Sequence, residues 1–302
     1  MDHVAFDREP PATLTTMVMA FGGWIDAGRA ATGAVRHLIR DLSAERLASI
    51  DAEEFFVLTQ QRPEVRLRPD GEREIQWPPS EFFAWRGLGE AGGNGLLLFC
   101  GPEPHQRWRT YTKAFLDVAE RCGVRRIVSL GALLASTPHT RPIRVTARCT
   151  DPAVRALLEA WGIYRLPTYE GPTGISSVVL DAAGRRDIQH VGFMGQAPHY
   201  IPDSENPAAI QALVSYAARL LHLSPDMSRF AEAIQDFRIQ CDRAVARDRA
   251  TREHVRRLEQ QYDSEAGEER QPLPDGELDS EKLMQDLEDF LRKQQGGGAD
   301  SA

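Results

Sequence analysis

Short apolar runs alternate with segments of helical periodicity along most of this chain. Four runs are apolar almost throughout, as expected of buried strands: Met17–Phe21, Leu96–Cys100, Ile127–Leu130 and Val191–Met194. Weaker strand candidates are Leu47–Ile50, Val65–Arg68, Glu74–Trp77 and Arg144–Ala147. Helical spacing of apolar residues marks Val35–Leu42, Trp108–Ala119, Val154–Trp161, Ile175–Ala182 and Ile210–Leu221. This alternation favours a mainly parallel sheet with helices on both faces, so we predict a three-layer α/β/α fold.

Local signals add detail to this pattern. The sequence Pro69-Asp70-Gly71 favours a tight turn, so residues 65–77 are predicted to form a β-hairpin, either as an insertion or at an edge of the sheet. Asp151-Pro152 and Asn206-Pro207 each place a capping side chain before a proline, an order typical of helix starts. The aromatic run Phe82–Trp85 is expected to cover the sheet or to lie in a subunit contact.

The pattern changes after Leu223. Between Met227 and Tyr262 there is no proline or glycine, and apolar residues recur mostly every three or four positions. We predict a helical arm over residues 225–265 that follows an α/β/α core over residues 1–224. The arm is either a hairpin that turns near residues 246–251 or one long helix, and its apolar seam packs on its own core or on another subunit.

The last segment, residues 266–302, is predicted to be an acidic linker followed by a short tail helix. Four apolar residues form one stripe on that helix, and these tail anchors are expected to dock on a partner or on the chain's own body: Leu283, Leu287, Phe290 and Leu291.

Charge and composition exclude several classes of protein. Residues 263–302 contain 12 acidic and 4 basic residues, a net −8, which equals the formal charge of the whole chain and leaves the preceding residues neutral. Residues 1–262 therefore lack the excess of positive charge that is typical of nucleic-acid-binding proteins. The four cysteines are too widely spaced for a zinc motif. No leader sequence or apolar run of roughly 18 residues suggests secretion or a membrane span, so a cytoplasmic protein is expected.

The segment from Gly23 to Ala30 resembles a phosphate-binding loop only in its glycine spacing. A Walker A loop ends in Gly-Lys-Ser/Thr, whereas here Arg29 and Ala30 follow Gly28, and Asp26 would stand among the phosphates. Gly22 and Gly23 would instead allow a sharp exit from the strand, and Asp26 would cap the following helix. We therefore expect no nucleotide, no other cofactor and no metal.

A second candidate site arises where loops follow the buried strands. His139 and His199 each come directly after proline in such a loop, and the carboxyl ends of parallel strands meet at one edge of a sheet. The candidate pocket contains these loop residues together with the glycine-rich start of the fourth helix: Gly22, Gly23, Trp24, Asp26, His139, Thr140, Arg141, Gly171, Thr173, Gly174, His199 and Tyr200.

Two interpretations of this pocket stay open. A histidine could act as an acid or base there, and the helix start at 171–174, with Pro172 as its first helical residue and Arg141 nearby, could hold an anion. Alternatively, the histidines only stabilise stiff proline loops through hydrogen bonds. No nucleophile elbow and no catalytic pair of carboxylates accompanies them, so we assign no catalytic residue.

Five motifs in register carry a resemblance to a known family. They are FGGWIDAG from Phe21, CGPEPHQRW from Cys100, LGALLASTPHTRP from Leu130, YEGPTGI from Tyr169 and APHYIPDSENP from Ala197. Over about residues 15–265 the chain resembles the bacterial branch of the family of the second proteasome assembly chaperone. The resemblance implies an α/β/α core, a homo-oligomer, no established catalytic activity and relatives that bind proteasome subunits.

This resemblance favours a non-catalytic, homo-oligomeric protein-binding factor whose partners are a second copy and, as the family suggests, proteasome subunits or another protein. Some members dock through a terminal hydrophobic-Tyr-any-residue motif, and Asp300-Ser301-Ala302 does not match it, so docking by that device is not expected. The alternative is a small-molecule-binding protein or an enzyme that uses the pocket at the carboxyl edge of the sheet.

Overall fold

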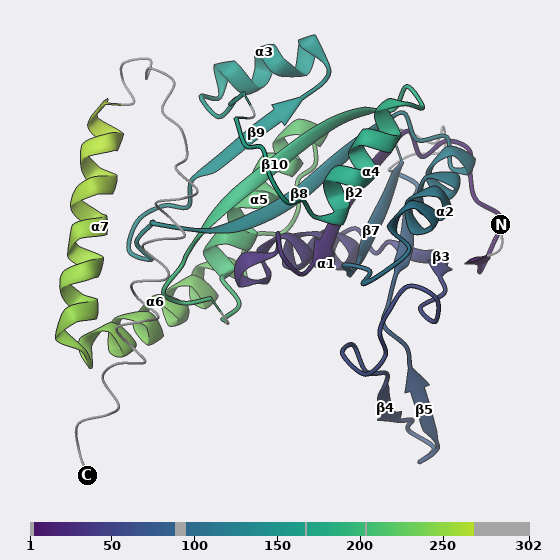
Figure 1. Ribbon diagram of the computed structural model, residues 1–302, viewed down its shortest axis with the longest axis horizontal. Coiled ribbons are helices and arrows are strands. Elements are labelled where there is room, and N and C mark those ends of the chain that lie inside the picture. Colours follow the sequence, from purple (N-terminus) through teal and green to yellow (C-terminus); the bar gives the residue numbers. More distant parts are fainter. Residues whose placement is uncertain (1–2, 88–94, 167, 203, 269–302) are drawn as a thin grey trace.

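The computed structural model describes residues 3–87, 95–166, 168–202 and 204–268 (Figure 1). The predicted tail stripe from Leu283 to Leu291 and nearly all of the predicted linker lie outside these residues.

One eight-stranded sheet forms the centre of the molecule (Figure 1). Its strands follow the order β1 (Val4–Phe6), β3 (Glu45–Ile50), β6 (Glu81–Trp85), β7 (Leu96–Pro102), β2 (Thr16–Gly22), β8 (Arg126–Ala135), β10 (Gln189–Pro198) and β9 (Val145–Cys149). The four strands β7, β2, β8 and β10 run parallel, and the strands on both flanks pair antiparallel. The prediction of an α/β sheet is confirmed, and its parallel part is the centre of a mixed sheet.

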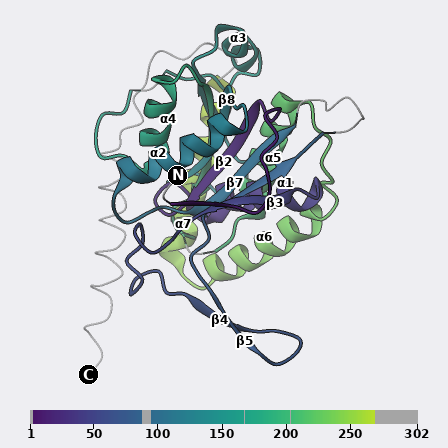
Figure 2. The same ribbon diagram turned by 90° about the vertical axis from the view of Figure 1, so that its right-hand side faces the viewer.

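Helices cover both faces of the sheet (Figures 1 and 2). Their bounds are α1 Ala30–Asp41, α2 Trp108–Arg121, α3 Pro152–Ala160, α4 Ile175–Gly184 and α5 Pro207–Leu221. Alternate residues of β2 point to opposite cores, because Met17 and Met19 join α2 and α4, whereas Val18 joins α1 and α5. The sheet therefore has one apolar core on each face, and the prediction of a three-layer α/β/α fold is confirmed.

Four phenylalanines dominate the core under α2 and α4. The ring of Phe115 lies 4.7 Å from that of Phe99, 5.2 Å from that of Phe82 and 5.7 Å from that of Phe21, centroid to centroid. Phe82 is fully buried in strand β6, so this aromatic run forms part of the sheet itself. Trp77, which precedes the Phe82–Trp85 run in the sequence, is by contrast 52% exposed.

The predicted hairpin is present. β4 (Glu64–Leu67) and β5 (Arg73–Gln76) form a separate antiparallel pair that projects from the body (Figures 1 and 2). The helix starts predicted at Asp151 and Asn206 are also confirmed, because each side chain accepts a hydrogen bond from a backbone N–H in the first turn of its helix. The start predicted at Pro172 is wrong: α4 begins at Ile175 with Gly174 as its N-cap.

The arm consists of two helices, α6 (Phe230–Ala246) and α7 (Arg249–Glu268). The helix is interrupted between Ala246 and Arg249, inside the predicted turn. Helix α7 then runs across the ends of β8 and β10 (Figure 1). Phe230 joins the core under α1 and α5, while Phe237, Cys241, Val255 and Leu258 are also buried. These seam residues therefore pack within their own chain, and α7 takes in the first three residues of the predicted linker.

Candidate functional site at the carboxyl edge of the sheet

Two long neighbouring strands carry the predicted histidine loops to the arm. β8 and β10 pair in parallel from Arg126 and Gln189 to Ala135 and Pro198. The loop after each strand therefore leaves the sheet at the same edge, where Pro138-His139 and Pro198-His199 lie side by side. The backbone N–H and the Nδ1 atom of His199 both lie within hydrogen-bond distance of the Ala135 carbonyl oxygen, at 3.2 and 3.1 Å.

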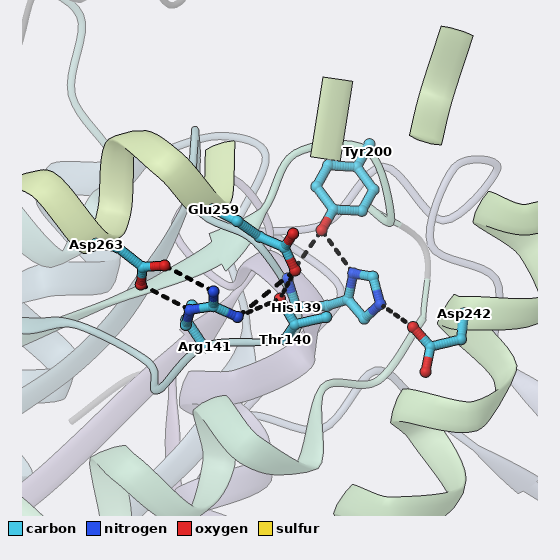
Figure 3. A network of polar contacts seen from close by, with 7 residues as sticks. All are labelled: His139, Thr140, Arg141, Tyr200, Asp242, Glu259 and Asp263. Carbon is cyan, nitrogen blue, oxygen red and sulfur yellow. Dashed lines mark hydrogen bonds and ion pairs between the residues drawn. The ribbon is translucent and has the colours of Figure 1, made fainter. Parts of the chain in front are cut away.

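His139, itself buried, is at the centre of a hydrogen-bond chain that runs from Tyr200 to the exposed Asp242 (Figure 3). Its backbone N–H donates to the Tyr200 hydroxyl oxygen at 2.8 Å, and its Nδ1 lies 2.7 Å from the same oxygen. Its Nε2 lies 3.1 Å from Asp242 Oδ1 of α6. Every contact is satisfied when the Tyr200 hydroxyl donates to Nδ1 and the Nε2–H donates to Asp242. Burial raises the pKa of Tyr200, so its hydroxyl keeps the donated proton.

Helix α7 supplies the acidic partners for the residues that follow His139 (Figure 3). The Thr140 hydroxyl donates to Glu259 at 2.5 Å. Arg141 holds Asp263 through two hydrogen bonds of 2.7 Å each. The Arg141 guanidinium keeps the pKa of Asp263 below its ordinary value, which is the expected effect of a charge-assisted, two-pronged contact.

Further contacts extend this interface along α7. Arg144 pairs with Glu265 and lies over the Tyr262 ring, 4.0 Å from its centroid. The Tyr262 hydroxyl donates to the Pro142 carbonyl oxygen at 3.1 Å. The Nε2 atoms of His199 and His254 lie 3.1 Å apart. The arm therefore covers this part of the predicted pocket, and His139 and His199 are only 5% and 6% exposed.

Three of the remaining predicted pocket residues, Gly22, Gly23 and Gly174, lie around Glu103 at the ends of β2 and β7. The Glu103 N–H donates to the Gly22 carbonyl oxygen at 2.7 Å, and its Oε1 accepts from the Ile175 N–H at 2.7 Å. This carboxylate occupies the N-terminal end of α4, which one of the two interpretations offered as a candidate position for an anion. Arg141, which that interpretation placed nearby, instead contacts Asp263. Gly171, Thr173 and Trp24 are exposed.

Asp26 is held in place by α1. Its Oδ1 accepts from the Thr32 N–H at 3.0 Å and its Oδ2 accepts from the Thr32 hydroxyl at 2.6 Å. The carboxylate thus satisfies a backbone donor in the first turn of α1, although Arg29 is the residue at the N-cap position. Burial is the largest influence on the Asp26 pKa and raises it. The Asp26 carboxylate, in the loop from Gly23 to Ala30, is therefore already bonded to the hydrogen-bond donors of Thr32.

The arrangement at this edge holds two parts of the protein together. His139, Thr140, Arg141, His199 and Tyr200 each contact another side chain or the backbone of the same chain. Within the described residues, no group of three or more His, Cys, Asp or Glu side chains is placed to hold a metal ion. None of the described helices is long and apolar enough to cross a bilayer.

Sequence reasoning missed the acidic partners on the arm, which are Asp242, Glu259, Asp263 and Glu265. A signal for them exists: Glu259 and Asp263 are four residues apart and each directly follows a seam position, Leu258 or Tyr262. Such positions lie at the border of a helix's buried face, where a carboxylate can reach a neighbouring loop.

Comparison with known proteins identifies the family. The profile of the PAC2 family matches residues 20–245. The chain belongs to the PAC2 family. This assignment agrees with the five motifs, which all lie inside the matched range.

Solved structures of relatives cover most of this PAC2 protein. A PAC2 family protein from Streptomyces avermitilis is 34% identical, with a TM-score of 0.71 over 80% of this chain and 99% of the other. The Mycobacterium tuberculosis proteasome-assembly chaperone homologue is 32% identical, with a TM-score of 0.69 over 80% of this chain and 100% of the other. PbaB of Pyrococcus furiosus, an archaeal proteasome activator, shares the fold at 17% identity, with a TM-score of 0.65 over 81% and 99%. No curated protein matches.

Proposed function

We propose that this PAC2 protein is a non-catalytic, homo-oligomeric factor that binds proteasome subunits in the cytoplasm. The observation that carries the proposal is the closure of the carboxyl edge by the chain's own arm. The side chains most suited to acid–base chemistry, His139 and His199, are buried and contact α6, α7 or the backbone of the same chain. The proteasome-assembly chaperone homologue at 32% identity supports this choice of partner.

The alternative, a small-molecule site or an active site at this edge, is less well supported. Such a site would need a hollow lined by polar groups that are free to meet a substrate. Here Glu259 and Asp263 of α7 already contact Thr140 and Arg141, and Glu103 already occupies the N-terminal end of α4. A ligand at either position would have to displace an internal carboxylate.

Self-association in this proposal uses the β4–β5 hairpin. Val65 and Ile75 are directly paired, and Leu67 lies on the same face, because alternate residues of a strand point to the same side; Trp77 directly follows the end of β5. These four side chains are between 52% and 72% exposed. The opposite face carries Glu64, Arg66, Glu74 and Gln76.

An apolar face of this kind matches a second copy of itself. A two-stranded hairpin on its own is marginal in water, so a hairpin that projects from the body benefits from a partner surface. In a twofold contact the same patch meets itself, and apolar side chains satisfy that requirement, while Arg73, the partner of Leu67, lies at the end of this face. Trp77 supplies the aromatic side chain that such contacts favour.

Light scattering on a size-exclusion column tests this proposal. The full chain should show a mass that is a multiple of 33.7 kDa, and the double variant Leu67→Ser and Ile75→Ser should show a lower mass. The matched control replaces the directly paired residues on the other face, Arg66→Ser and Glu74→Ser, and should keep the wild-type mass. A wild-type monomer would refute homo-oligomerisation, and an unchanged mass of the first variant would refute the role of the hairpin.

A further inference from the structure

An open pocket lies away from the carboxyl-edge cluster and shares no residue with it. It has a volume of about 470 Å³ and is bounded by α1, by the first residues of α5 and α6, and by strands β6 and β7. Phe83, Cys100, Ile210 and Phe230 are among the side chains of its apolar wall. This size lies within the range of pockets that hold small organic molecules.

The sequence builds this pocket through the contact between α1 and α5. A Cβ atom on Gly33 would lie 2.6 Å from Ile210 Cδ1, so glycine at this position lets the two helices approach closely. Phe230, at the start of α6, packs its ring 4.8 Å from the ring of His37, centroid to centroid. The apolar wall is therefore made by side chains that the core holds in place, as a binding site requires.

Three arginines from two helices surround this apolar wall. Arg36 and Arg40 come from α1, one helical turn apart, and Arg229 directly precedes α6. In the part of the chain that the structure describes, none of the three forms an ion pair, and the one hydrogen bond of Arg36 is to the Thr32 hydroxyl at 3.3 Å. Such guanidinium groups are free to meet an anion.

Carboxylates also lie near the three arginines, but in the described residues none of them forms an ion pair with Arg36, Arg40 or Arg229. Glu81 is bonded to Arg46 outside the pocket at 3.1 Å, which leaves Glu205 as the acidic residue of the lining without a described ion pair. Asp41 and Asp226 line an adjoining hollow together with His37, Arg40 and Arg229, and among the residues that the structure describes neither carboxylate forms an ion pair with these arginines. The carboxylates lower the net charge of the opening, but they leave the guanidinium hydrogen-bond donors available to a ligand.

His37 adds a polar group to the pocket wall. Its side chain lines the pocket, the residue is 4% exposed, and its Nε2 has no hydrogen-bond partner among the described residues. A buried polar atom without a partner is uncommon and calls for an explanation. A bound molecule with an acceptor or donor would supply the missing contact.

Cys100 helps to define what the pocket does. Burial raises the pKa of its thiol to about 11, so the side chain is an uncharged, weakly polar part of the wall and a poor nucleophile. With no activated nucleophile in its lining, the pocket is suited to binding.

We propose that this pocket binds a small organic phosphate, with its phosphate group on Arg36, Arg40 and Arg229 and its apolar body against Phe83, Ile210 and Phe230. Guanidinium groups make two parallel hydrogen bonds to phosphate oxygens, and several arginines together match a dianion. The apolar wall accounts for an organic body, because inorganic phosphate would leave that surface unused. The proposal is independent of the partner assigned above.

Calorimetric titration of the full chain with 2-naphthyl phosphate tests this inference. One molecule should bind per chain with a dissociation constant of about 10–100 μM, and affinity should fall as salt is added. The neutral 2-naphthol, which has the same body, and inorganic phosphate, which has the same charge, should each bind at least about tenfold more weakly. Equal binding of 2-naphthol would show apolar adsorption only and would overturn the proposal, as would no detectable binding of 2-naphthyl phosphate.

Two variants separate charge from shape. Arg40→Gln with Arg229→Gln removes two exposed charges and should weaken binding at least about tenfold without changing the melting temperature. Ala233→Trp keeps all three arginines and fills the opening from the exposed side of α6, so it should also abolish binding. Arg155→Gln, on exposed α3, is the control and should bind like the wild type. Wild-type affinity in both test variants would refute the assigned location.

Discussion

Replacing Tyr200 with phenylalanine tests whether the hydrogen-bond chain through His139 stabilises the fold. The substitution keeps the ring and removes only the hydroxyl oxygen, which lies 2.8 Å from the His139 backbone nitrogen and 2.7 Å from its Nδ1. His139 is 5% exposed, so water cannot readily replace the lost partner. A buried N–H left without an acceptor costs about 1–3 kcal/mol.

This cost converts into a measurable change in melting temperature. One kcal/mol shifts the midpoint by about 2–4 °C in a domain of this size class, so a cost of about 1–3 kcal/mol in Tyr200→Phe should lower it by about 2–12 °C. Differential scanning calorimetry at neutral pH would measure the shift. The variant should also be cleaved faster by trypsin at the arginines of α7, because His139 no longer positions Asp242 and the arm loosens.

Tyr216→Phe is the matched control. The Tyr216 ring stacks on Phe193 at 6.1 Å between centroids, and its hydroxyl makes no hydrogen bond in the described residues. Its melting temperature should stay within about 1 °C of the wild type. If Tyr200→Phe shows the same small change as this control, the hydrogen-bond chain contributes nothing to stability and the structural role assigned to His139 is wrong.

Three further outcomes follow from the electrostatics. Burial raises the Asp26 pKa, so the stability that this group contributes is lost as pH rises above about 4. The melting temperature of the wild type, measured relative to that of Asp26→Asn, should therefore fall over that pH range. A difference that does not change with pH would contradict this expectation. Removing the carboxylate at α4 with Glu103→Ala should cost about 0.5–2 kcal/mol, and added sulfate should raise the melting temperature of the variant more than that of the wild type, because the Ile175 N–H is then free for an anion. Burial raises the pKa of all four thiols, so at about pH 8 a thiol reagent should modify the native protein far more slowly than the unfolded one.

Local patterns in the sequence predicted the elements that build the two cores. The runs at Met17 and Leu96 are apolar because their strands are covered on both faces, and this leaves a direct sequence signal. Strand β6 was missed because its five residues follow two prolines and are rich in aromatics, which also suit an interface. The predicted runs end at Leu130 and Met194 because the glycines that follow, Gly131 and Gly195, resemble strand exits. In the structure β8 and β10 continue through these glycines to Ala135 and Pro198.

The site was predictable in part. The loops after β8 and β10 meet as the parallel arrangement required, so His139 and His199 were correctly expected at one edge. The spacing of Glu259 and Asp263 places them beside the buried face of α7, but it does not say which loop they reach, since the contact from Arg141 to Asp263 spans 122 residues. The glycine loop and the helix start at Gly174 were expected to join the histidines, whereas the structure gathers them around Glu103.

The central claim, that this PAC2 protein binds proteasome subunits, is tested most directly by sedimentation velocity with purified components. The full chain should be mixed with proteasome subunits encoded by the same genome and compared with a chain that ends at Glu268, which lacks the predicted tail anchors. We expect a complex that sediments faster than either component, and weaker capture by the shortened chain at an unchanged melting temperature. Independent sedimentation of the full chain and the subunits, over concentrations up to about 100 μM, would contradict the account.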